Sequence, residues 1–213
     1  MKEVLLHPGY FGPIAQFVAM GKAEKVWFEN EDNFQKQTYR NRTYIYSANG
    51  KLALTIPVKH TGNKTQHQKY REVKIENDFS WQTQHWKSIQ TCYRTSPFFE
   101  FYEDDFAHLY HKRFDYLLDF NYQSLEVILN SLEWDLDITK TTEYKKIAPE
   151  GVLDSRGLVK AKCDQSFDFA PYTQVFEDRS GFLSNLSILD LLFNEGPNSE
   201  VYLEQQILPN ITS

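Results

Sequence analysis

A strand, a helix and a second strand at the start of the chain constrain its fold most. Residues 4–6 form a short apolar run that ends at His7, and residues 25–29 form the next apolar run. Between them, Pro13 suits the first turn of a helix and Gly21 suits its end. Two strands joined by such a helix lie parallel, with a right-handed crossover. The opening therefore predicts an α/β fold.

A hairpin and then helices follow. Asn49-Gly50 lies between β-rich runs at residues 43–46 and 51–56, a pattern typical of a β-hairpin. Apolar residues recur with the helical period over residues 80–132, whereas residues 147–185 carry no sustained period. We therefore expect an N-terminal mixed sheet with a β-α-β start and a β-hairpin, followed by a helical half and a loop-rich C-terminal segment.

The chain is expected to form a single domain, because 213 residues suffice for one core or for two small cores that share an interface. An alternating run at residues 136–138 predicts one further strand. The parts are a sheet-forming part (residues 1–76), a helical part (residues 77–134), and a loop-rich segment with C-terminal helices (residues 135–213).

Composition narrows the classes of function. The net charge of -6 disfavours a duplex nucleic-acid binder, although a small basic pocket for phosphate remains allowed. Cys92 and Cys163 cannot form a disulfide framework, and the sequence has no tight Cys/His cluster, so we expect no metal. Nucleotide-binding glycine motifs and the nucleophile elbow are missing, so no cofactor is expected. The N-terminal apolar run is too short for a signal peptide and no segment suits a membrane span, which favours a cytoplasmic protein.

Five motifs follow one another along nearly the whole chain. They are Leu6-His7-Pro8-Gly9-Tyr10-Phe11-Gly12-Pro13, residues 29–42, residues 54–58, residues 81–99, and residues 186–193 before Gly196-Pro197. This ordered set resembles the WbqC-like protein family, whose opening pattern is His-x-x-Tyr-x-x-Pro. The resemblance implies a role in bacterial surface-polysaccharide biosynthesis, O-antigen production in particular. Tyr10 of the opening motif is a candidate substrate-binding residue.

His7 is the first candidate catalytic residue. It follows the first predicted strand, and ligands of open parallel sheets bind outside the carboxyl ends of the strands. A neutral histidine there could accept a proton or bind phosphate. The alternative is a histidine that caps the following turn.

Three cations form a candidate anion site. Lys36, Arg40 and Arg42 share one face if this stretch is extended. Arginine offers forked donors that suit a phosphate or a carboxylate. Glu29 and Glu31, also candidate substrate-binding residues, could instead pair with these cations in an internal salt-bridge ladder.

His85 is the second candidate catalytic residue. It could act as a general base in a pocket floored by Trp81 and Trp86, whose rings suit stacking on a sugar or a base. The alternative is a core histidine on the apolar stripe of its helix. Asp104 and His108 lie one helical turn apart but lack a third metal ligand, so a solvated helix face is the better interpretation.

Residues 148–184 have little regular pattern but carry several large rings, which must be buried against something. We expect this segment to fold over the N-terminal pocket, with Tyr172 and Gln174 contacting the ligand. The alternative is a covering arm that shields the sheet edge.

Two functions remain open at this point. The first is a cytoplasmic transferase that moves a group to or from a nucleotide-activated or amino sugar. The alternative is a non-catalytic ligand-binding or assembly protein of the same pathway. Either would bind a small anionic or sugar ligand and no nucleic acid, and the sequence does not fix the oligomeric state.

Overall fold

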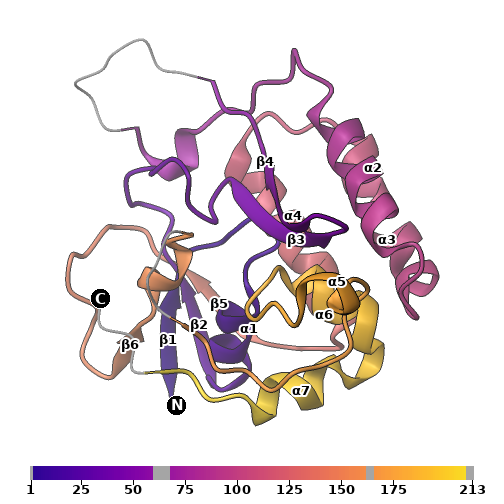
Figure 1. The fold of residues 1–213 in the computed structure, drawn as a ribbon. Helices are drawn as coiled ribbons and strands as arrows, with labels where there is room; N and C mark the ends of the chain where they lie inside the picture. Colours follow the sequence, from indigo (N-terminus) through magenta and orange to yellow (C-terminus); the bar gives the residue numbers. More distant parts are fainter. Residues whose placement is uncertain (1, 60–67, 162–165, 210–213) are drawn as a thin grey trace.

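The structure is a computed structural model that describes residues 2–59, 68–161 and 166–209. Its centre is a four-stranded parallel sheet with the order β5-β2-β1-β6 (Figure 1). The strands are β1 (Glu3–Leu6), β2 (Lys25–Phe28), β5 (Asp137–Lys140) and β6 (Val152–Asp154). The sheet thus joins the start of the chain to strands that come more than a hundred residues later. Cys163 lies outside the described residues.

The hairpin forms a second, two-stranded sheet. β3 (Arg42–Ser47) pairs antiparallel with β4 (Gly50–Thr55), and Ser47 lies opposite Gly50. Gly50 has a φ of 91°, which suits glycine at the end of so tight a turn.

Most of the helices lie to the right of the parallel strands in the view of Figure 1. The helices are α1 (Ile14–Gly21), α2 (Trp81–Tyr93), α3 (Phe99–His111), α4 (Leu117–Ser131), α5 (Glu177–Ser180), α6 (Ile188–Glu195) and α7 (Ser199–Gln205). Short 3₁₀ turns are η1 (Tyr70–Glu72), η2 (Arg156–Val159) and η3 (Gly196–Asn198). Helix α3 packs against both α2 and α4, and α1 packs against β1, α6 and α7. The α/β class, the β-α-β start, the hairpin and the central helices are confirmed.

Aromatic rings fill the space between α1, α6 and the layer of α2, α3 and α4. The Phe106 ring lies 5.7 Å from that of Phe11 and 5.5 Å from that of Phe193, both edge to face. Edge-to-face pairs add to the free energy of ordinary apolar burial. Much of the aromatic content of the sequence therefore builds the core. No helix in the described ranges is long and apolar enough to cross a membrane.

Candidate functional site

The carboxyl ends of the parallel strands place chemically capable side chains along one edge of the sheet. His7 follows β1, Glu29 follows β2, Thr141 follows β5, and Asp154 ends β6. The chain runs from β1 to β2 to β5 on one side, and then crosses to place β6 on the other side of β1. The strand order therefore reverses between β1 and β6, the position at which open α/β sheets bind ligands.

Three charged or titratable side chains meet at this point. Nη2 of Arg40 lies 2.7 Å from Nε2 of His7 and 2.7 Å from Oδ2 of Asp32. Nε2 of His7 is also 3.0 Å from Oδ2 of Asp32. The two contacts of Nε2 require different tautomers: it accepts from Arg40 when Nδ1 carries the proton, and donates to Asp32 when Nε2 carries it.

Burial sets the charges in this cluster. Desolvation lowers the pKa of His7 to about 4, and the Arg40 cation adds to that effect, while Asp32 opposes it. Desolvation raises the pKa of Asp32, but the hydrogen bond to His7 and the nearby cation bring it below its ordinary value. At neutral pH the site therefore holds a carboxylate, a guanidinium and a neutral imidazole. Such an imidazole can accept a proton.

Arg40 is the most unusual member of the cluster. Its side chain is only 1% exposed, yet Nε and Nη1 have no hydrogen-bond partner within the described part of the chain. The guanidinium lies over the ring of Tyr70, 5.6 Å from its centre, and Asn121 donates to the backbone carbonyl of Arg40 at 2.7 Å. Unpaired buried donors on a cation are costly, so they favour an anion as a partner.

A cleft of about 270 Å³ opens onto this cluster. Its lining combines the three clustered side chains with residues from the β6 region and from the loop before it. They are His7, Asp32, Gln35, Arg40, Tyr144, Lys146, Asp154, Arg156, Gly157, Val159 and Lys160.

Arg156 fixes one wall of the cleft. It donates to the Asp154 carboxylate at 2.6 Å and to the backbone carbonyls of Lys145 and Lys146 at 2.7 and 2.9 Å. These bonds hold the loop after β5 against the end of β6. Lys146 and Lys160 are exposed and form no ion pair within residues 2–59, 68–161 and 166–209. The lining thus has four cations and two carboxylates, in a chain with a net charge of -6.

Glu29 and Glu31 lie beside the cleft rather than in its lining. The Glu29 carboxylate accepts from the Glu31 backbone N–H at 2.8 Å and from the Thr141 hydroxyl at 2.9 Å, and lies 3.7 Å from Nη1 of Arg156. Arg71 donates to Glu31 at 2.7 Å. Both glutamates therefore support the loops around the site.

The common face expected for Lys36, Arg40 and Arg42 is not formed. Residues 36–41 make successive turns, with a φ of 61° at Gln37, so the period-two alternation of a strand does not apply. Arg40 points into the His7 cluster, whereas Lys36 and Arg42 line a separate groove of about 470 Å³. Arg42 donates there to the Tyr44 hydroxyl at 3.2 Å.

The structure places His85 in the core, with Tyr10 and the two tryptophans. Nδ1 of His85 is 2.9 Å from the Tyr10 hydroxyl, and burial lowers the pKa of His85 to about 4. Trp81 meets the His85 ring edge to face, and Trp86 stacks on Tyr110 at 5.3 Å. None of these four candidates lines a described cavity, so the interpretation of His85 as a core histidine agrees with the geometry.

Tyr172 and Gln174 hold a buried carboxylate instead of facing the cleft. The Tyr172 hydroxyl donates to Asp190 at 2.5 Å, and the Gln174 amide donates to the same oxygen at 2.8 Å. Tyr93 donates to the other oxygen at 2.8 Å. Desolvation raises the pKa of Asp190, and these three donors oppose that rise. Of the expected lid, the described residues that line the cleft lie within residues 154–160.

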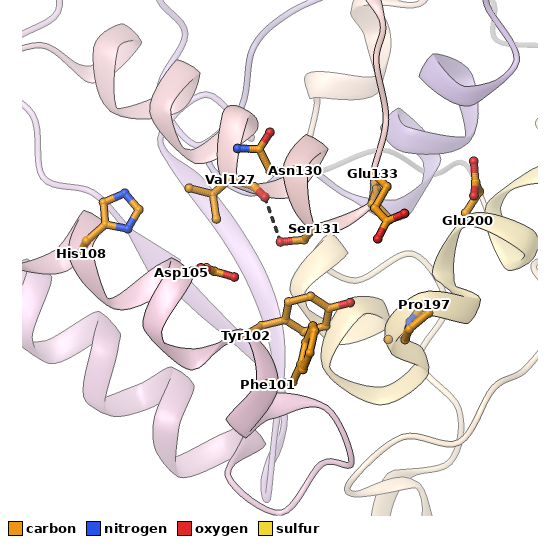
Figure 2. A pocket seen from close by; sticks show the side chains of 12 residues that line it. Phe101, Tyr102, Asp105, His108, Val127, Asn130, Ser131, Glu133, Pro197 and Glu200 are labelled. Atoms are coloured by element: carbon orange, nitrogen blue, oxygen red, sulfur yellow. Dashed lines mark hydrogen bonds between the residues drawn. The ribbon is translucent and has the colours of Figure 1, made fainter.

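Another cavity, apart from the cleft, lies between α3, α4 and the η3–α7 region (Figure 2). It has a volume of about 450 Å³ and includes His108, with carboxylates from Asp105, Glu133 and Glu200. In the parts of the chain that the structure covers, no group of three or more His, Cys, Asp or Glu side chains could hold a metal ion. Unlike the cleft, this cavity has no buried unpaired donor or acceptor in its lining.

Several cleft residues escaped the sequence analysis. Asp32 lies within the second quoted motif, but its single carboxylate among other polar residues gave no signal. Asp154 and Arg156 follow a three-residue strand in a stretch without periodicity. Recognising that short strand would have placed both at the sheet edge with His7.

Comparison with known proteins gives the family of the chain. The chain is 26% identical over 220 residues to "Uncharacterized protein Rv1507c" of Mycobacterium tuberculosis (strain ATCC 25618 / H37Rv), an alignment that covers 92% of this chain and 91% of that protein. No solved structure matches. The family model of the WbqC-like protein family matches residues 7–160, a stretch that begins at His7 and ends at Lys160 of the cleft. The chain belongs to the WbqC-like protein family.

Proposed function

We propose that this protein binds an anionic small molecule in the His7–Arg40 cleft and acts in the cytoplasmic stage of bacterial surface-polysaccharide biosynthesis. The observation that carries the proposal is Arg40, a buried guanidinium with two unpaired nitrogens beside a neutral histidine at the reversal point of the sheet. A phosphate or carboxylate would supply the missing hydrogen-bond acceptors. Lys146 and Lys160 would add attraction at the rim.

The reaction that suits this arrangement is group transfer to or from a nucleotide-activated or amino sugar. An acceptor hydroxyl or amine would give its proton to His7 while its lone pair forms the bond to the transferred group. The electron pair of the broken bond would leave with the phosphate, and Arg40 would stabilise that charge. Asp32 would stabilise the imidazolium until the proton passes on to the leaving phosphate or to water.

A non-catalytic ligand-binding or assembly role is the second candidate. The observation that favours it is the pKa of His7, which at about 4 makes the imidazole a weak base. In that case the cleft would bind the same anion without transferring a group.

Binding is tested first, by isothermal titration with inorganic pyrophosphate. Replacing Arg40 by Gln removes the cation while keeping a polar side chain of related shape, and we expect at least about a tenfold loss of affinity, the scale of one charge-assisted hydrogen bond. Arg113, which forms an exposed ion pair with Asp115, offers a matched control. Arg113→Gln removes the same charge from the surface outside the cleft. Equal binding by the Arg40→Gln variant and the parent would refute the proposed site.

Turnover separates the two candidate functions. A coupled assay over a panel of nucleotide-sugars would show product formation by the parent protein. His7→Asn should abolish turnover while leaving pyrophosphate affinity within about twofold, because asparagine keeps a polar group but cannot take up a proton. If the His7→Asn variant retains turnover, the enzyme does not use His7 as a base. If the parent protein turns over none of the nucleotide-sugars, the binding role is favoured.

A further inference from the structure

A second cavity adjoins the cleft. It has a volume of about 250 Å³ and shares Gly157 and Lys160 with the cleft lining. These two residues belong to η2 and to the position just after it. Tyr39 also lines the second cavity, and it immediately precedes Arg40 in the chain. The backbone N–H of Tyr39 donates to the Val159 carbonyl at 2.8 Å, which ties the two walls together.

The second cavity differs from the cleft in its chemistry. Its lining includes two aromatic side chains, Tyr39 and Phe167, and one further cation, Lys51, and no acidic residue occurs among the described residues that line it. Asn185 contributes an amide whose Oδ1 already accepts from the Ala15 backbone N–H at 2.8 Å, so its amide N–H groups are the part that can serve a ligand. Aromatic faces with a few polar groups suit a flat ring or a sugar.

Size and charge connect the two cavities. Each is smaller than the roughly 300–1,000 Å³ of pockets that enclose a whole small-molecule ligand. Together they fall within that range, and the Lys160 ammonium belongs to both linings. A ligand that used both would place its anionic part against Arg40, Lys146 and Lys160, and its ring against Tyr39 and Phe167.

We infer that the two cavities are subsites for one ligand, a nucleoside diphosphate or its ester, with the phosphates in the cleft and the ring beside Tyr39 and Phe167. This inference rests on the proposed function, because it requires that the cleft bind phosphate. It adds the class of ligand and a recognition element for the ring. Phe167 and Lys51 contribute to affinity only through the ring or its adjacent phosphate.

The test compares two probes that differ in the ring. Titration with inorganic pyrophosphate reports the cleft alone, and titration with uridine diphosphate reports both subsites. We expect uridine diphosphate to bind at least about tenfold more tightly, the scale of one base–aromatic stacking contact. Phe167→Leu keeps an apolar side chain of similar size and should remove most of that advantage while leaving pyrophosphate affinity unchanged. Lys51→Gln is a second variant at an exposed position and should weaken uridine diphosphate binding by a smaller factor.

Phe101→Leu is the matched control, because Phe101 is 73% exposed and lines the cavity of Figure 2 instead. It should leave both affinities unchanged. Equal affinity for pyrophosphate and uridine diphosphate, or an advantage that survives both Phe167→Leu and Lys51→Gln, overturns the two-subsite inference and leaves the anion site intact. If neither probe binds, the proposed function fails together with it.

Discussion

At the scale of single residues, one histidine in the site and one in the core both have a pKa that burial lowers. His7 and His85 come from different parts of the molecule, but burial is the main cause of the low pKa in both, about 4 against an ordinary value of 6.5. A neutral buried imidazole that gains a proton on unfolding favours the unfolded state as the pH falls. Their contribution to stability is therefore complete above pH 6.5 and is lost progressively toward pH 4.

The pH dependence of unfolding tests this point. Between pH 7.5 and pH 5 each of the two histidines should lower the free energy of unfolding by about 2 kcal/mol, from the linkage of proton uptake to unfolding. His85→Gln cannot titrate, so this variant should lose about half as much stability over that interval, measured by urea denaturation at each pH. His111→Gln, at an exposed position in α3, should retain the full dependence. An unchanged dependence in the His85→Gln variant would show that the imidazole of His85 takes up its proton over the same pH range in the folded and the unfolded state.

Arg40 shows at the same scale what the sequence could and could not predict. Arg40 stays a predicted substrate-binding residue, because the chemistry of arginine suits anions wherever it lies. The expectation that Arg40 shares a face with Lys36 and Arg42 was wrong, because it required an extended strand and the chain turns there. Local turns depend on tertiary hydrogen bonds, such as that from the Tyr39 N–H to the Val159 carbonyl at 2.8 Å, which no local pattern reveals.

At the scale of elements, helix α6 has identifiable residues at both of its ends. Ser187 accepts a hydrogen bond from the Leu189 N–H at the start of α6, and Gly196 ends that helix with a φ of 53°. Glycine suits such a helix end because it adopts a positive φ without steric cost. The structure adds a second reason for glycine, because a Cβ at Gly196 would lie 2.5 Å from the Phe98 ring.

Gly196→Ala should therefore destabilise the protein through two additive effects. The positive φ alone costs about 1 kcal/mol, and the clash with Phe98 should raise the total to about 2–4 kcal/mol. Gly151→Ala is the matched control, since Gly151 has a φ of 82° and a Cβ there would meet nothing within 4 Å. Thermal unfolding of both variants separates the two effects. Equal losses in the two variants would mean that Phe98 moves aside without cost.

The segment before α6 was the hardest element to predict. Of its rings, Phe169 and Tyr172 are buried, and Phe167, Phe176 and Phe182 are half-buried against the core. Tyr172 and Gln174 are directed to Asp190, a residue of α6 that the sequence analysis treated only as part of a helix. A single buried aspartate gives no pattern by which its donors can be found. Sequence reasoning thus recognised that the segment must pack, and could not identify its partner.

At the scale of the whole molecule, the parallel sheet depends on both ends of the chain. β1 lies between β2 and β6, and β2 lies between β1 and β5, so strands from beyond residue 135 complete the sheet. The parts at residues 1–76 and 135–213 therefore share one sheet, and the single domain stays a prediction. Parallel sheets are found almost only where both faces are buried. A chain that lost two of the four strands should therefore not form a stable fold.

A fragment of residues 1–134 tests that dependence. It retains the hairpin and the helices α1 to α4, and should still lack a cooperative thermal transition when followed by circular dichroism. Adding a separately purified fragment of residues 135–213 should restore the transition. Cooperative unfolding of the first fragment alone would show that residues 1–134 fold independently of β5 and β6.

The position of β1 also has a consequence for the order of events on the ribosome. β1 is synthesised before β2, β5 and β6, and its partner β6 follows almost 150 residues later. At roughly 5–20 residues per second, that delay lasts on the order of ten seconds. Throughout it one edge of β1 has unpaired backbone groups that can associate with other nascent chains. The strand order that forms the anion cleft therefore leaves an apolar segment exposed during synthesis. We expect chaperones that bind extended apolar segments to bind the growing chain.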